Sequence, residues 1–281
     1  MATSDRAPSS TRMMPALRLS NLSQRLVAAI VGLPVLIGAI WAGGNVFLAV
    51  VLAACLAAAW EFSRLSVASG NPVAKPVLIT GVAVLTIAGP QFAPAAITAV
   101  LLAALTWSLW RYQRGEGGAD WLWTVGGVLY TGWLPAHFLA LRAGERGFEW
   151  VSLALCATIV SDTAAYAVGR AFGRRRMAPR VSPGKTWEGA IGGLLATVLF
   201  TPLLGWLLGL PNVPLLFILG FGVSVFAQAG DLVESMLKRN AGVKDASGLV
   251  PGHGGLLDRM DSLVFVGPLV YYYVRWLVLT P

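Results

Sequence analysis

The sequence predicts an all-α, polytopic integral membrane protein with about nine transmembrane helices. Three observations support this: 56% of the 281 residues are hydrophobic, only 12% are charged, and the apolar runs are many and long. A soluble domain carries about 25% charged residues. Because lipid offers no hydrogen bonds, only helices or closed barrels cross it, and these runs lack the alternation of barrel strands.

The apolar segments can be divided into nine candidate spans. The first run, 26–60, is too long for one helix of ~20 residues, and Gly43-Gly44-Asn45 divides it into two. The other spans are expected at 76–89, 93–110, 121–141, 150–170, 187–208, 213–238 and 262–279. Two glycine pairs have the spacing that allows close contact between membrane helices: Gly189 with Gly193, and Gly205 with Gly209.

The basic residues predict the orientation of the chain. The net charge is +8, and with nine spans all but three of the 21 Lys and Arg residues fall on one side. The exceptions are Arg142, Arg146 and Arg275. Because cytoplasmic loops carry the excess of positive charge, we expect a cytoplasmic N-terminus and an external C-terminus. The basic excess favours anionic lipid as a partner, and no nucleic-acid-binding motif is present.

Three regions are expected along the chain. Residues 1–25 form a disordered cytoplasmic tail, because this Ser-, Pro- and Arg-rich stretch lacks the apolar core and cleavage site of a signal peptide. Residues 26–150 form transmembrane helices one to five. Residues 151–281 form the remaining spans and their cytoplasmic loops, which carry nearly all of the unusual polar residues.

Two aspartates lie inside predicted spans, Asp162 in the sixth and Asp231 in the eighth. Each precedes the basic end of its span, at Arg170 or Lys238, by about two helical turns, which is roughly 10 to 12 Å at ~1.5 Å per residue. Ionisable groups at this depth are costly and usually functional. We therefore expect a water-filled pocket open to the cytoplasm. A structural Asp–Arg pair or a proton relay is the alternative.

A hard-oxygen metal site is predicted from Asp258 and Asp261, which share one helix face if the helix begins near Leu256. With a third carboxylate from Asp231 they suit Mg²⁺, which typically takes one or two carboxylates together with phosphate oxygens and water. The alternative is a solvated helix start, where negative charge meets the positive end of the helix dipole.

Cations are interleaved with acids between 235 and 261, instead of forming a plain run of membrane anchors. They are Lys238, Arg239, Lys244 and Arg259. A polyphosphate needs this mixture, because cations neutralise its oxygens and carboxylates hold its metal. The PGHGG turn at 251–255 has glycines that let backbone approach a ligand. Its His253 is either a donor to a ligand or an ordinary turn residue.

A second candidate phosphate site is the segment SPGKTWEG at 182–189, which opens span seven. Ser182 as N-cap followed by Pro183 predicts a helix start. The positive end of that helix would face the cytoplasm beside Lys185 and Thr186, as an anion site requires. An ordinary helix start is the alternative, and the spacing of a P-loop is absent.

The stretch S-x-x-K-R-x4-K-D-x5-P-G-H-G-G-x-x-D-R-x-D, from Ser235 to Asp261, resembles the C-terminal motif of the phosphatidate cytidylyltransferases, the CDP-diacylglycerol synthases. The segments 161–173 and 182–189 are also similar to family segments, although Gly184 stands where many members carry Lys. The N-terminal half is similar to the family in its hydropathy and in the segments LPVL and AAWEFSRL.

The resemblance implies that CTP and phosphatidic acid react to give CDP-diacylglycerol and pyrophosphate. It implies a multi-pass homodimer in a bacterial inner or plasma membrane, with Mg²⁺ and a second ion such as K⁺, and an active site that faces the cytoplasm. Metal ligation is implied for Asp231, Asp258 and Asp261. Catalytic roles are implied for Lys185, Lys238, Arg239, Lys244, Asp245 and His253. Substrate contacts are implied for Asp162, Ser182, Thr186, Glu188, Ser235, Gly254, Gly255 and Arg259.

Two other functions compete with this one. Buried acids and glycine-broken helices suit an ion-coupled transporter, but the two halves of the chain show no repeat. Another CTP-dependent lipid phosphotransferase, such as a polyprenol kinase, is the second alternative. The DGxxAR…GxxxDxxxD pattern of the CDP-alcohol phosphotransferases is absent.

Overall fold

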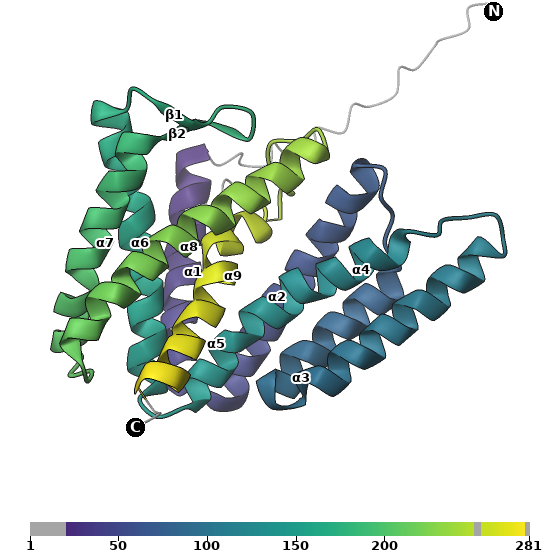
Figure 1. Ribbon diagram of the computed structural model, residues 1–281, viewed down its shortest axis with the longest axis horizontal. Coiled ribbons are helices and arrows are strands. Elements are labelled where there is room, and N and C mark those ends of the chain that lie inside the picture. Colours follow the sequence, from purple (N-terminus) through teal and green to yellow (C-terminus); the bar gives the residue numbers. More distant parts are fainter. Residues whose placement is uncertain (1–20, 250–253, 279–281) are drawn as a thin grey trace, which may run out of the picture.

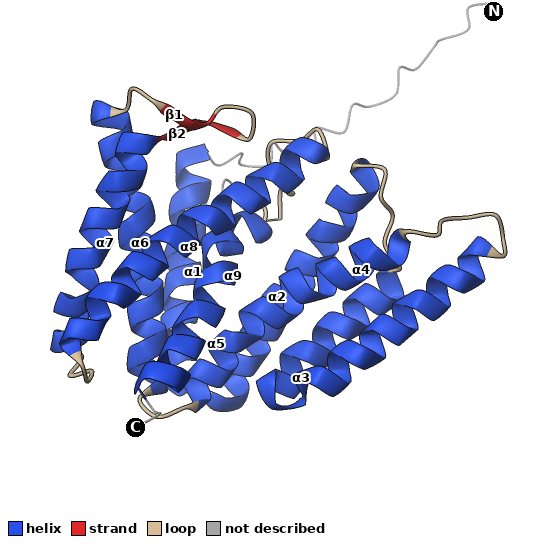
Figure 2. Cartoon of the chain, in the orientation of Figure 1, coloured by secondary structure: helices blue, strands red, loops and turns tan. Residues whose placement is uncertain are grey.

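The computed structural model describes residues 21–249 and 254–278, and most of them are helical (Figures 1 and 2). The helices are α1 (Asn21–Ala42), α2 (Gly44–Ala68), α3 (Lys75–Tyr112), α4 (Asp120–Val128), α5 (Leu134–Ala143), α6 (Gly147–Phe172), α7 (Trp187–Leu207), α8 (Val213–Asn240) and α9 (Leu257–Tyr273). Two π-helical segments, η1 (Leu129–Trp133) and η2 (Val274–Val278), join α4 to α5 and extend α9. The predicted all-α fold is confirmed, with one short β-hairpin added.

Among the described residues, five helices are long and apolar enough to cross a membrane: α2, Phe92–Tyr112 within α3, α6, α7 and α8. Shorter apolar helices cover Gly32–Ala42 and Lys75–Pro90. The chain is therefore a polytopic membrane protein, while the number nine stays a prediction. Helix α1 begins at Asn21, so residues 21–25 of the expected tail are helical. Residues 1–20 lie outside the described part of the chain.

Glycines with positive φ divide the long apolar runs at the predicted places. Gly43 has φ 63° and separates α1 from α2. Gly89 has φ 66° and breaks α3 between the two spans expected there. Only glycine adopts this backbone region readily, so a side chain at either position would be strained. The span expected at 121–141 is one continuous helical path, because η1 carries the chain from α4 into α5.

Helices α6 and α7 pack so closely that two glycines of α7 touch the backbone of α6. A Cβ on Gly189 would lie 2.6 Å from the carbonyl oxygen of Ala165, and one on Gly193 would lie 2.8 Å from that of Ser161. The close contact predicted for this pair is confirmed. The second pair does not form one helix face, because Gly209 lies beyond the end of α7.

Arg142 and Arg146, two exceptions to the charge bias, bind carbonyls near helix C-termini. Arg142 donates from Nε to the carbonyl oxygen of Ile40 at 2.6 Å, at the end of α1. Arg146 donates from Nη2 to that of Leu208 at 2.7 Å, just after α7. Each guanidinium thus satisfies a carbonyl that a helix end leaves unpaired and meets the negative end of the dipole.

The segment 182–189 begins differently from its prediction. Ser182–Thr186 is strand β2, paired antiparallel with β1 (Arg176–Ala178). Helix α7 starts after it, with Thr186 as N-cap accepting a hydrogen bond at 3.2 Å from the backbone N–H three residues on. The expectation that Ser182 caps the helix and Pro183 opens it is wrong, because hairpin pairing holds this backbone extended.

Candidate active site

A cavity of about 660 Å³ lies between the C-terminal half of α6, the hairpin, the start of α7 and α8. Asp162 and Asp231 both line it, as their matched depths in the sequence predict. Its other polar lining residues are Tyr166, Arg170, Arg176, Ser182, Lys185, Thr186 and Gln228. The walls therefore combine carboxylates with cations in a chain that is otherwise largely apolar.

Lys185 and Asp231 link the hairpin to α8. Nζ of Lys185 lies 2.7 Å from Oδ2 of Asp231 and 3.4 Å from the carbonyl oxygen of Gln228. Ser235, one turn further along α8, donates to Oδ1 of Asp231 at 3.3 Å. The side chains of the ion pair are 22% and 32% exposed, so a ligand in the cavity can reach both.

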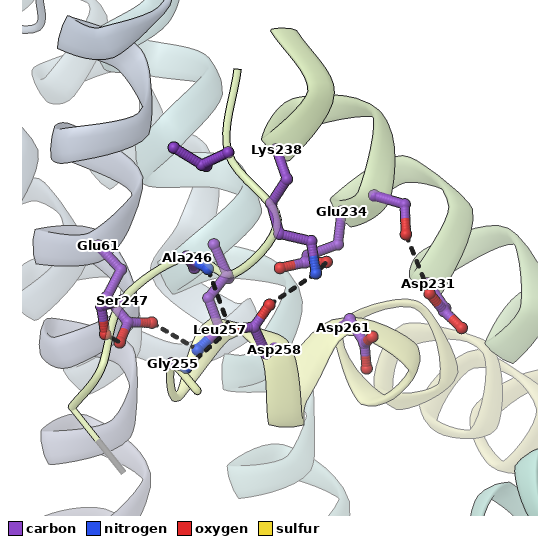
Figure 3. Close-up of polar contacts among 12 residues, drawn as sticks. Glu61, Asp231, Glu234, Lys238, Ala246, Ser247, Gly255, Leu257, Asp258 and Asp261 are labelled. Atoms are coloured by element: carbon purple, nitrogen blue, oxygen red, sulfur yellow. Dashed lines mark hydrogen bonds and ion pairs between the residues drawn. The ribbon is translucent and has the colours of Figure 1, made fainter. Parts of the chain in front are cut away.

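Helices α8 and α9 cross at Gly230, and this crossing brings carboxylates together. A Cβ on Gly230 would overlap the carbonyl oxygen of Asp261, so the approach requires glycine. The next residue, Asp231, lies near Asp261 (Figure 3), and its charge acts on both Asp261 and Asp162. The backbone N–H of Ser262 donates a hydrogen bond to Oδ1 of Asp261 at 2.7 Å. Three helices thus contribute one carboxylate each to this region.

A second charged group surrounds Lys238 (Figure 3). Its Nζ donates to Oδ1 of Asp258 at 2.6 Å and makes a short ion pair with Glu234, which is fully buried. Oδ2 of Asp258 accepts hydrogen bonds from the backbone N–H groups of Ala246 at 3.0 Å and Gly255 at 2.7 Å. Asp258 therefore ties Lys238 and the loop after α8 to the first turn of α9.

These contacts bear on the predicted metal ligands. Within residues 21–249 and 254–278, no three His, Cys, Asp or Glu side chains are grouped as a site for one ion. Asp231 follows Gly230, which touches the backbone of Asp261, whereas Asp258 accepts from Lys238 and from two N–H groups. The trio stays a prediction, and the pair Asp231 and Asp261 is the part of it that the α8–α9 crossing brings together.

Two predicted residues hold backbone segments in place. Arg239 donates from Nε to the carbonyl oxygen of Val181 and from Nη1 to that of Val243, each at 3.2 Å. It therefore connects the hairpin to the loop that follows α8. Glu188, in the first turn of α7, accepts hydrogen bonds from the backbone N–H groups of Arg174 at 3.0 Å and Arg175 at 3.2 Å. That contact closes the turn between α6 and the hairpin.

The remaining predicted loop residues lie between α8 and α9. Lys244 and Asp245 are exposed to solvent. Gly254 has φ 84°, and a Cβ there would lie 3.0 Å from Oδ2 of Asp258. His253 lies outside the described residues, and its role stays a prediction.

A second cavity, of about 520 Å³, is lined mainly by apolar side chains of α1, α2, α5, α6 and α9. Val50 and Val51 of α2 and Leu263 of α9 are among them. Arg259, in the first turn of α9, also lines this cavity. The predicted substrate contact Arg259 therefore belongs to an apolar cavity, while the predicted contacts Asp162, Ser182 and Thr186 belong to the polar one.

Three residues that the sequence reasoning did not assign occupy central positions. Glu234 is buried beside Lys238, Gln228 lines the polar cavity, and Glu61 of α2 accepts hydrogen bonds from the start of α9. Glu61 carries a signal in the sequence, because it is an acid that directly follows the apolar run 26–60.

The sequence matches known proteins over most of its length. The model of the cytidylyltransferase family matches residues 23–277. The chain is 35% identical to a phosphatidate cytidylyltransferase of Brucella suis over 265 residues, covering 91% of this chain and 94% of that one. It is 36% identical over 267 residues to one of Pseudomonas aeruginosa, covering 91% and 97%. It is 32% identical over 284 residues to one of Synechocystis, covering 90% and 96%.

Proposed function

Because the chain belongs to the cytidylyltransferase family, we propose that its polar cavity is where CTP and phosphatidate meet. The chain condenses these substrates to CDP-diacylglycerol and pyrophosphate, as a membrane-bound nucleotidyltransferase of phospholipid synthesis. The observation that supports this placement is the Lys185–Asp231 ion pair, in a cavity that Asp162 and two arginines also line.

The reaction is a substitution at the α-phosphorus of CTP. An oxygen of the phosphatidate phosphate forms the new P–O bond, the bond from the α-phosphorus to the bridging oxygen breaks, and pyrophosphate leaves with that electron pair. The attacking oxygen is already ionised near neutral pH, so neither a protein nucleophile nor a strong base is needed. Catalysis then depends on aligning two anions and neutralising their charge.

Cations from three elements can neutralise the phosphates of CTP in this cavity. Arg170 lies near the end of α6, Arg176 begins β1, and Lys185 lies on β2. A phosphate oxygen that binds Lys185 takes the place of Asp231 as its partner. The Asp231 carboxylate is then available to a divalent cation, so binding of the nucleotide and of the ion support each other.

We assign Mg²⁺ to Asp231 and Asp261, which the close α8–α9 crossing at Gly230 brings near each other. Two carboxylates fit this ion, because Mg²⁺ is usually held by one or two of them while water and substrate phosphates complete its shell. Bound there, it would neutralise charge on the transferred phosphate. Asp258 orients Lys238 and the loop before α9, and a second ion such as K⁺ stays a prediction.

The apolar cavity fits an acyl chain, and in this proposal it receives one from phosphatidate. Its lining is mainly hydrocarbon, and Arg259 supplies a cation toward which the lipid phosphate can point. Arg259 and Asp261 lie in the first turns of the same helix. The lipid would enter from the membrane and CTP from water, with the start of α9 between them.

The proposal places the active site on the cytoplasmic face of a bacterial inner or plasma membrane, in a homodimer with cytoplasmic N-termini. The hairpin, the end of α8 and the start of α9 lie at one end of the molecule, where α1 also begins (Figure 1). That end carries the basic segment 170–185 and the cations Lys238, Arg239, Lys244 and Arg259, and basic loops face the cytoplasm. The homodimer is inferred from the resemblance to the family.

The test is an assay of purified protein in detergent with labelled CTP, Mg²⁺ and phosphatidate. We expect labelled CDP-diacylglycerol, an equal amount of pyrophosphate, and no product when diacylglycerol replaces phosphatidate. Solute flux in liposomes without turnover would favour a transporter. Transfer of phosphate from CTP to a lipid alcohol would favour a lipid kinase.

A further inference from the structure

A buried carboxylate from the N-terminal half of the chain holds the start of α9 (Figure 3). Glu61 of α2 has 0% exposure. Its Oε1 accepts a hydrogen bond from the backbone N–H of Leu256 at 2.9 Å, and its Oε2 accepts one from that of Leu257 at 2.7 Å. The hydroxyl of Ser247 also donates to Oε1 in a short contact. Three donors from the segment before α9 and its first turn thus converge on one side chain of α2.

The N–H groups involved are ones that a helix cannot satisfy by itself. Leu256 and Leu257 stand at the N-cap and the first position of α9, and the first N–H groups of a helix have no partner within it. An anionic oxygen there also meets the positive end of the helix dipole. Glu61 therefore caps the N-terminus of α9, although it belongs to another helix.

Gly255 lets the carboxylate come this close. A Cβ at Gly255 would lie 2.8 Å from both oxygens of Glu61. The N–H of Gly255 donates to Oδ2 of Asp258 at 2.7 Å. Gly255 thus lies against a carboxylate of α2 and donates to one of α9, and a side chain here would push Glu61 away.

We infer that Glu61 is a positioning residue for cytidylyl transfer: it fixes the start of α9 and so determines where Asp258 and Asp261 stand. The inference rests on the proposed placement of the active site at the α8–α9 crossing. Glu61 does not line the polar cavity, so it acts through the helix that it caps.

Glu61→Gln tests the inference, because it keeps the shape of the side chain and changes its donors and acceptors. An amide has one oxygen, so in either orientation its NH₂ group meets the N–H of Leu256 or Leu257. We expect kcat to fall about 10- to 100-fold, as for other residues that orient metal ligands. The Mg²⁺ concentration for half-maximal rate should rise, because Asp261 moves with α9. KM for CTP should stay near the wild-type value, because the cations of α6 and the hairpin do not move.

Gly255→Ala provides a second arm, as a double-mutant cycle with Glu61→Ala. In the wild-type background the new methyl group displaces the carboxylate, so the loss should resemble that of Glu61→Gln. In the Glu61→Ala background the space is free, so Gly255→Ala should cause a clearly smaller further loss of rate than it causes in the wild-type background. Additive losses would show that the two residues act independently and would overturn the inference.

Ser63→Ala is the matched control, because Ser63 is also buried in α2 and donates to the carbonyl of Trp60 in its own helix. We expect its rate to equal that of the wild type.

Two results for Glu61→Gln would overturn the inference. One is a wild-type kcat together with a wild-type Mg²⁺ midpoint. The other is a lower yield of folded protein in which each folded molecule keeps full activity. If Glu61→Ala does not fold, the inference is tested by kcat and the Mg²⁺ midpoint of Glu61→Gln and of Gly255→Ala. A wild-type chain that makes no CDP-diacylglycerol would instead refute the proposed function.

Discussion

Lys185 of the hairpin and Asp231 of α8 form an ion pair with an Nζ–Oδ2 distance of 2.7 Å. Both side chains are partly exposed, and such pairs contribute only about 0–1 kcal/mol to stability. The pair therefore matters more for placing a cation and an anion in the cavity than for holding the fold. It leaves both groups close to where a nucleotide phosphate and its metal would bind.

Replacing Lys185 should lower the catalytic efficiency with CTP. Lys185→Met should lower kcat/KM for CTP about 100- to 1000-fold, the loss expected when one donor to a developing charge is removed. Lys185→Arg should retain part of the rate, because the positive charge remains. Steady-state kinetics with varied CTP measure the effect. Arg180→Ala is the control, since Arg180 is exposed and lies outside the cavity lining; equal rates for Lys185→Met and this control would exclude a phosphate-binding role.

Gly230→Ala should damage both stability and activity. The added methyl group would overlap the backbone of Asp261, and overpacking typically costs about 1–3 kcal/mol. We expect a lower midpoint of thermal unfolding in detergent and a reduced turnover number. Gly126→Ala is the matched control, because a Cβ on this glycine of α4 meets nothing within 4 Å. It should stabilise by about 0.5–1 kcal/mol, as alanine does inside a helix. Identical unfolding of the Gly230 variant and the wild type would contradict this account of the crossing.

The two aspartates of α9 should respond differently to Mg²⁺. EDTA should abolish turnover and added Mg²⁺ restore it. Asp261→Asn should raise the Mg²⁺ concentration for half-maximal rate at least about tenfold, because it removes an anionic ligand. Asp258→Asn should abolish most turnover, because Lys238 loses the carboxylate that positions it. The Mg²⁺ concentration for half-maximal rate of the residual activity should be unchanged. Titrating Mg²⁺ for each variant makes the comparison, with Glu116→Gln as an exposed control. A raised midpoint for Asp258→Asn would make Asp258 a ligand, as the sequence predicts.

Filling the apolar cavity should affect the lipid and spare the nucleotide. Val50→Trp places a large ring in the cavity lining, so KM for phosphatidate should rise severalfold while KM for CTP stays unchanged. KM for phosphatidate is measured in mixed micelles in which the mole fraction of phosphatidate is varied. Val84→Trp is the control, because Val84 is 48% exposed on α3 and outside this lining. A Val50 variant with wild-type KM for phosphatidate would place the acyl chain elsewhere.

The sequence predicts the polar cavity from two aspartates alone. Asp162 and Asp231 lie at matched depths because the rise per residue of a helix is constant, and hydropathy locates the helix ends. The same reasoning does not reveal that Asp231 pairs with Lys185. It predicts a helix that begins at Pro183 after an N-cap at Ser182, since Ser and Pro favour helix starts. The pairing partner that makes this segment a strand lies earlier in the chain.

By itself, the sequence determined the fold class, the helix breaks at Gly43 and Gly89, the family motif and two of the carboxylates that line the polar cavity. These follow from hydropathy, backbone freedom and spacing, which act locally along the chain. Only the tertiary structure decided that Lys238 sits between Glu234 and Asp258, and that Glu61 caps α9. Such contacts depend on which helices cross and how closely, and that depends on packing among residues far apart in the sequence.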